Sequence, residues 1–202
     1  YAKNGIELPE IKDNGGILIN SITKKCKKNL IISKECFLMT NDFSNELYKK
    51  ELILDKQIFV KKCSFDDIES LIELERGYRL EEVSVTGIPE SDALLRMLLE
   101  KALQKQIIFS ALYSDSSNEV IAKVATNARG KNFYQIGGVF TKKEFRNKGI
   151  MFNLMIQFMN YIHSENKKAT LFVNIHNEPA KKVYEKLGFI LIGKYRISYF
   201  QK

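Results

Sequence analysis

Apolar positions follow two rhythms along the chain. Short runs rich in β-branched and aromatic residues predict strands at 57–63, 106–114, 119–126, 132–140 and 169–175, and one or two more within 189–200. Apolar residues at helical spacing predict helices over 64–80, 88–104, 150–163 and 177–187. The order of these elements predicts a mixed α/β domain over 57–202, with a largely antiparallel front half and a strand–helix–strand unit behind it.

Local signals sharpen several of these boundaries. Ser64, with Asp67 three residues on, forms a variant of the capping box at the start of the first helix, and Gly188 ends the last one. The third helix repeats apolar residues in a stripe that we expect to face the core, at Met151, Leu154, Met155, Phe158 and Ile162.

Residues 1–56 give a weaker pattern. Two strand-like runs, 16–22 and 29–39, flank a cluster of four lysines that we interpret as a solvated turn. Because the first residue is Tyr1, we expect the chain to begin inside a longer protein or to have been processed. The segment is interpreted as an N-terminal subdomain, or a truncated part of one, of unknown role.

Charge is distributed unevenly. The net charge is +8, and residues 131–202 hold 13 basic against 4 acidic side chains, whereas residues 57–130 hold 9 against 12. Two surfaces of opposite sign suggest two different ligands.

Cys26, Cys36 and Cys63 are widely spaced and indicate reduced thiols of a cytoplasmic protein. With two histidines we expect no metal site, and no apolar run approaches the length of a membrane span.

Two short stretches carry candidate chemistry. Gly137 and Gly138 fall inside a predicted strand, where a glycine pair marks a bulge or a close approach to the backbone. The turn "FRNKGIM" (145–151) follows that strand and opens a helix with two cations and a glycine. Backbone N–H groups at a helix start, with cations beside them, form a phosphate site, although an ordinary surface turn would have the same composition.

Three stretches together, "QIGGVFT", "FRNKGIM" and "NEPAKKVYEKLGF", resemble the GNAT superfamily of N-acetyltransferases over about residues 57–200. Residues 146–151 occupy the pyrophosphate-loop pattern Q/R-x-x-G-x-G/A, from which Met151 departs. Asn177, Ala180 and Tyr184 share one face of a helix by their spacing. The resemblance implies a GNAT-like mixed sheet flanked by helices and an enzyme that moves an acetyl group from acetyl-CoA to a primary amine.

The resemblance also implies site residues. Tyr184 would be the general acid that protonates the departing thiolate. The strand amide near Val139 would stabilise the developing oxyanion. The residues expected to bind the cofactor are Val139, Phe140, Thr141, Arg146, Asn147, Lys148, Gly149, Ile150, Met151 and Asn177. The base is not identified, and Glu81, Glu82, Glu90 and Asp92 are candidates for an acidic acceptor side.

Other functions stay open. A catalytically inactive GNAT-like domain could bind CoA as a sensor or scaffold. A nucleic-acid-binding module is suggested by charge alone, but the basic residues follow the cofactor motifs and do not interleave with aromatics. The expected partner is a small-molecule or peptide amine, which could be cationic, with no membrane and no metal. The acceptor and the choice between monomer and homodimer are not predicted.

Overall fold

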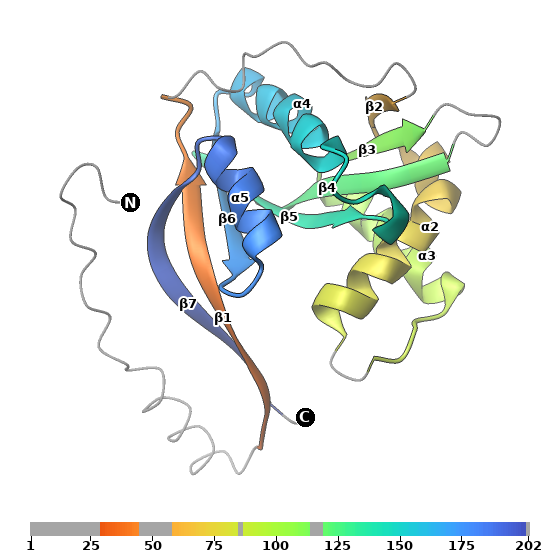
Figure 1. Cartoon of the computed structure of the whole chain (residues 1–202). Coiled ribbons are helices and arrows are strands. Elements are labelled where there is room, and N and C mark those ends of the chain that lie inside the picture. Colours follow the sequence, from red (N-terminus) through yellow and green to blue (C-terminus); the bar gives the residue numbers. More distant parts are fainter. Residues whose placement is uncertain (1–28, 45–57, 85–86, 114–118, 201–202) are drawn as a thin grey trace.

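The computed structural model describes residues 29–44, 58–84, 87–113 and 119–200 (Figure 1). The strand expected at 16–22, the lysine cluster and the turn after residue 113 lie outside these residues. The strands are β1 (Leu30–Asn41), β2 (Ile58–Lys62), β3 (Ile108–Tyr113), β4 (Glu119–Arg129), β5 (Phe133–Thr141), β6 (Lys168–Asn174) and β7 (Ile190–Phe200). The helices are α2 (Ile68–Tyr78), α3 (Asp92–Lys105), α4 (Ile150–Ser164) and α5 (Glu178–Lys186).

Within the described residues, the strands form one seven-stranded sheet in the order β2-β3-β4-β5-β6-β1-β7. Every neighbouring pair is antiparallel except β5 and β6, which are parallel. The predicted order of elements from residue 57 and the largely antiparallel sheet are confirmed, and 190–200 is a single strand.

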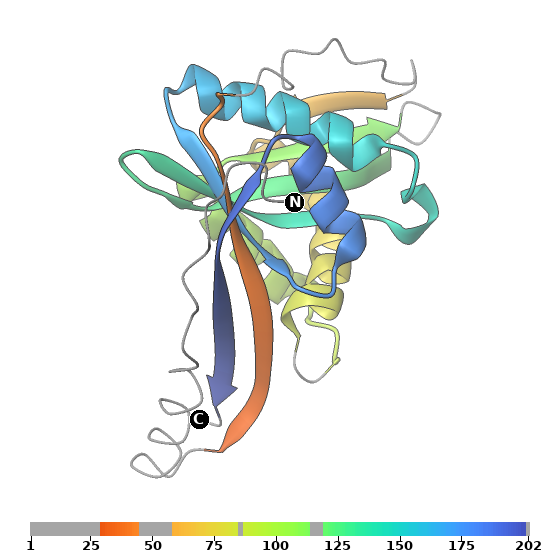
Figure 2. The same ribbon diagram turned by 60° about the vertical axis from the view of Figure 1, so that its left-hand side comes forward.

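Helices cover both faces of the sheet and bury two apolar clusters (Figures 1 and 2). On one face, α2 and α3 contribute Leu71, Leu74 and Leu95, which are fully buried. On the other face, α4 contributes Leu154, Met155, Phe158 and Ile162, which are also fully buried. The apolar stripe predicted for α4 therefore faces the core, with Met151 half-buried at its start.

Strand β1 lies inside the sheet, between β6 and β7. It pairs with both, from Cys36 to Asn41 on the β6 side, and its Cys36 and Met39 are buried. Figure 2 shows β1 and β7 side by side along their whole length. The boundary expected at residue 56 therefore does not separate two sheets, because a strand from before it completes the sheet that holds the later elements.

Strands β5 and β6 separate halfway along β5. Their parallel pairing ends at Ile136 and Leu171, and β5 continues through a bulge opposite β4. Gly138 has φ +58, in the left-handed region that favours glycine. A Cβ on Gly137 would lie 2.1 Å from the Asn127 side chain. The glycine pair thus forms the expected bulge, and the sheet opens beside it.

Candidate active site

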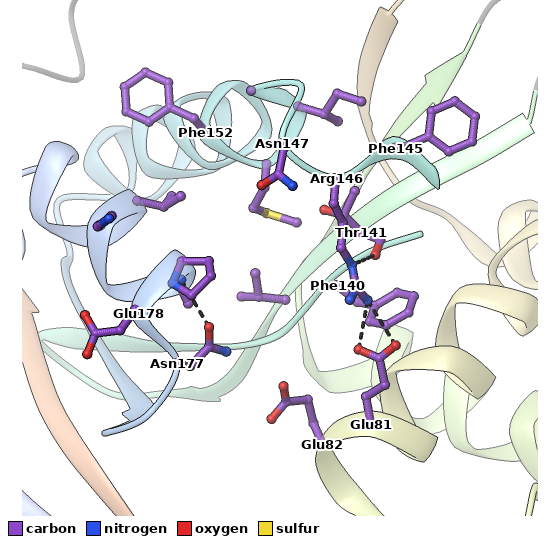
Figure 3. Close-up of a pocket in the computed structure, with 18 residues that line it drawn as sticks. Glu81, Glu82, Phe140, Thr141, Phe145, Arg146, Asn147, Phe152, Asn177 and Glu178 are labelled. Atoms are coloured by element: carbon purple, nitrogen blue, oxygen red, sulfur yellow. Dashed lines mark hydrogen bonds and ion pairs between the residues drawn. The ribbon is translucent and has the colours of Figure 1, made fainter. Parts of the chain in front are cut away.

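A pocket of about 620 Å³ occupies the opening beside β5 (Figure 3). It lies between the second half of β5, the start of α4 and the start of α5, at the carboxyl ends of two parallel strands, where ligands bind in open α/β sheets. Its lining is Glu81, Glu82, Val139, Phe140, Thr141, Phe145, Arg146, Asn147, Gly149, Ile150, Met151, Phe152, Asn177, Glu178, Pro179, Ala180, Lys182 and Val183.

The start of α4 gives the pocket its positive end. The turn before the helix passes through left-handed conformations at Asn147 (φ 60) and Gly149 (φ +75), and a Cβ on Gly149 would point into open space. The helix has neither a side-chain cap nor an acidic residue in its first turn. Its first N–H groups and its dipole are therefore available to an anion in the pocket.

Arg146 lines the pocket and contacts both β5 and the turn after α2. Its Nε donates to the Thr141 carbonyl at 2.9 Å, and its Nη2 lies 2.8 Å and 3.1 Å from the two Glu81 carboxylate oxygens (Figure 3). Lys143 adds a longer contact to Glu81 at 3.7 Å. A phosphate in the pocket would have to compete with Glu81 for this guanidinium.

Helix α5 forms the opposite wall. Asn177 caps it by accepting a hydrogen bond from the Ala180 N–H at 3.2 Å, which fixes the amide at the pocket edge. Asn177 and Ala180 line the pocket, as their shared face predicts. Tyr184, one turn further, does not line it and is buried in the core cluster.

Tyr184 is 5% exposed, and its ring packs edge-on against Phe189 with 5.8 Å between centroids. Burial raises the pKa of its phenol well above the ordinary value, and the charges of Glu82 and Tyr78 act in the same direction. The phenol is therefore protonated throughout the neutral range. It can donate a proton but is a weak acid.

The structure gathers most of the residues predicted to bind the cofactor. All of them except Lys148 line the pocket. The Lys148 ammonium instead lies 5.2 Å from the centroid of the Phe145 ring. Met151, which departs from the loop pattern, lines the pocket and also packs against the core cluster, so its side chain serves both surfaces.

The acidic residues expected on the acceptor side divide into two groups. Glu81 and Glu82 line the pocket, because a π-helical turn (Arg79–Val83) follows α2 and turns toward β5. Glu90 pairs with Arg79, and Asp92 pairs with Arg76, both outside the pocket lining. The four carboxylates therefore do not form one acidic face.

Several lining residues were not predicted. Phe145 and Phe152 flank the loop, and Lys182 adds a cation from α5. Phe145 is the first residue of "FRNKGIM" and Phe152 directly follows it, and this position is the only signal for either side chain. Lys182 lies two residues past Ala180, on no face that the motif spacing marks.

The described residues also bear on disulfides, metal sites and membrane-spanning helices. Cys36 and Cys63 are free and buried. Among residues the structure describes, no cluster of three or more His, Cys, Asp or Glu side chains is arranged to hold a metal ion, and no helix is both long and apolar enough to cross a membrane.

The segment that forms most of the pocket matches a known protein family. Residues 112–198, which run from β3 to β7 through the whole pocket loop, match the family described as FR47-like protein. A comparison with curated proteins finds no match.

Solved structures share the fold at low identity. One is described as an acetyltransferase of the GNAT family from Novosphingobium aromaticivorans, with a TM-score of 0.63 and 15% identity over 87% of this chain and 67% of that one. A structure of a Drosophila protein has a TM-score of 0.66 and 14% identity over 91% of this chain and 56% of that one. A structure from Clostridium acetobutylicum, described as a predicted acetyltransferase with acetyl-CoA, has a TM-score of 0.51 and 20% identity over 66% of this chain and 90% of that one.

The chain thus spans 56% of the length of the Drosophila protein and 67% of that of the Novosphingobium protein. At these identities the likeness shows a common fold. That fold is the one found in structures described as GNAT-family acetyltransferases, and within it residues 112–198 match the family described as FR47-like protein.

Proposed function

We propose that the protein is an acetyl-CoA-dependent N-acetyltransferase that moves the acetyl group to a primary amine. The observation that carries the proposal is the uncapped start of α4, which meets the bulged half of β5 in one pocket. A helix start binds the pyrophosphate, and a bulged strand leaves backbone groups for the amide-like pantetheine arm. The acetyl-CoA named with the Clostridium structure supports this ligand.

The proposed reaction uses the Val139 N–H of β5 and the Tyr184 phenol of α5. The amine attacks the thioester carbonyl carbon as a neutral nucleophile, and its proton passes to a base or to water. The Val139 N–H stabilises the oxyanion that forms. When the carbon–sulfur bond breaks, the electron pair remains on sulfur, and the Tyr184 phenol supplies the proton that converts it to the CoA thiol.

A cationic acceptor is favoured by Glu82, which lines the pocket close enough to Tyr184 to raise the pKa of its phenol. Its carboxylate would attract a protonated amine as it enters, and this attraction is screened over about 10 Å at 0.1 M salt. Raising salt should therefore increase the KM for the acceptor.

The binding step is tested with Gly149→Glu, which places a carboxylate in the open space at the start of α4. CoA affinity measured by calorimetry should fall at least tenfold, about 1.4 kcal/mol. Gly149→Ala is the matched control, since it introduces the same backbone strain at φ +75 without a charge. Equal affinities for wild type and Gly149→Glu would remove the pyrophosphate assignment.

The transfer step is tested by following thiol release from acetyl-CoA across a broad panel of primary amines. A CoA sensor is the second candidate, and the position of Tyr184 outside the pocket lining favours it. Tight binding of acetyl-CoA without turnover on any amine would support the sensor, whereas turnover of one amine class would support the transferase.

A further inference from the structure

A buried lysine lies beside the bulge of β5, outside the lining of the large pocket. Lys123, on β4, is 3% exposed and lines a second pocket of about 150 Å³ between α2, α3 and the sheet. Placing an ammonium group in a protein interior is costly unless it is paired and hydrogen-bonded. Its contacts therefore indicate what keeps the charge there.

Three groups surround the Lys123 ammonium. Its Nζ lies 2.9 Å from Glu75 Oε2 and donates to the Gly138 carbonyl at 3.2 Å. The centroid of the Tyr78 ring is 4.5 Å away. Glu75 is itself 13% exposed at its side chain and lies 3.8 Å from Arg79 Nη1, so the pair belongs to a mostly buried network on α2.

The contact with Gly138 is made at the bulge. The Gly138 carbonyl and the Val139 N–H are the two ends of one peptide unit, and in a trans peptide they point in opposite directions. Gly138 lines the small pocket and Val139 lines the large one. A cation that holds the carbonyl on one face of β5 therefore fixes the N–H toward the other face.

We infer that Lys123 is a positioning residue, which orients and polarises the Gly138–Val139 peptide so that the Val139 N–H stabilises the oxyanion of the thioester. This inference rests on the proposed acetyl transfer. When the amine nitrogen bonds to the carbonyl carbon, the π electrons of the C=O bond move to oxygen. They return when the carbon–sulfur bond breaks, so Lys123 gains and loses no proton.

The physical effect is cooperative hydrogen bonding. A carbonyl that accepts from a cation becomes more polarised, and the N–H of the same amide becomes a stronger donor. Removing an oxyanion donor outright costs about 10²–10³ in kcat. Because Lys123 acts through the peptide and the donor itself stays, we expect its loss to lower kcat by roughly tenfold.

The test uses acetyl-CoA labelled with ¹³C at the thioester carbonyl, and infrared difference spectra of the bound ligand. Polarisation by a donor lowers the carbonyl stretching frequency, and no acceptor is needed for this readout. Wild type should show a downshift on binding. Lys123→Met, which keeps the length of the side chain without its charge, should lose at least half of this frequency downshift. Free CoA has no thioester carbonyl, so its Kd for the variant should stay within about twofold of the wild-type value.

Two further variants complete the series. Lys123→Gln can donate without a charge and should give an intermediate downshift, which keeps the test available if Lys123→Met does not fold. Lys61→Met, at an ion-paired lysine on the exposed edge of β2, should match wild type. A full wild-type downshift in both Lys123→Met and Lys123→Gln would overturn the role of Lys123 and leave the proposed function in place. Failure of wild type to bind acetyl-CoA would instead overturn the proposed function.

Discussion

Burial decides the chemistry of single side chains in this protein. Tyr184 and Cys63 are 5% and 8% exposed, and burial is the first cause of the raised pKa at each. The sequence indicates Tyr184 through its spacing from Asn177, but spacing on one helix does not say how deeply each position sinks into the core. The packing of Tyr184 against Phe189 is local, five residues apart across Gly188, whereas the depth of both side chains depends on the core cluster formed by other elements.

Tyr184→Phe should lower kcat by about 10²-fold near neutral pH, because it removes the proposed acid and keeps the ring. Packing and CoA affinity should be unchanged. The raised pKa keeps the phenol protonated as pH rises, so the acid itself does not titrate first. The deficit should instead shrink at high pH, where the thiolate leaves without a proton. Single-turnover rates across pH measure this, and wild-type rates at neutral pH would assign Tyr184 to packing alone.

Cys63 gives a prediction that does not depend on activity. Burial raises the pKa of its thiol from 9.0 to about 11, and its Sγ donates to Ser110 Oγ at 3.2 Å. The folded state therefore favours the protonated form. The resulting stabilisation is complete below pH 9 and is lost as pH rises toward 11.

Iodoacetamide at pH 8 should therefore modify Cys63 in urea and leave it unmodified in the folded protein, as read by peptide mass spectrometry. In Cys63→Ala, the free energy of unfolding should fall less steeply between pH 9 and 11 than in wild type. Rapid labelling of Cys63 in the folded protein would show that the thiol is not protected by burial.

At the scale of elements, the hydrophobic pattern predicted the helices and strands but few of the contacts between residues far apart in the sequence. The helices, the strands and the bulge at Gly137 and Gly138 follow from short-range signals. The contact between Glu81 and Arg146 joins positions 65 residues apart. It arises because a π-helical turn redirects the chain after α2, and the amphipathic pattern there predicts only an ordinary helix end.

Glu81→Gln should tighten CoA binding by roughly three- to fivefold, within the ~1 kcal/mol typical of exposed ion pairs. The change frees the Arg146 guanidinium and removes a negative charge from the pocket lining. Calorimetry with CoA at low and high salt measures it, and the gain should shrink at high salt. Glu73→Gln, at an exposed ion pair on α2, is the control. Weaker binding in Glu81→Gln would mean that Glu81 supports the pocket instead of competing with its ligand.

For the molecule as a whole, the sequence predicts the elements but not all of their neighbours. Apolar alternation at 29–39 predicts a strand, yet nothing in it says that Thr40 pairs with Thr170 or that Cys36 pairs with Tyr195. Pairing over such distances is set by which edges are left open once the other elements have packed. Strand β1 fills the space between β6 and β7, and the role of the rest of residues 1–56 stays a prediction.

If β1 is integral to the sheet, a charge on its buried side should unfold the whole domain. Met39→Asp places a carboxylate at a position that is 4% exposed, with a cost of about 3 kcal/mol or more. Ile31→Asp, in the same strand at 54% exposure, should cost less than about 1 kcal/mol. Urea unfolding followed by circular dichroism compares the two midpoints. Loss of CoA affinity should accompany unfolding, because β6 and α5 depend on the same sheet. Equal midpoints for the two variants would mean that β1 is an appendage, and that residues 57–202 carry the fold without it.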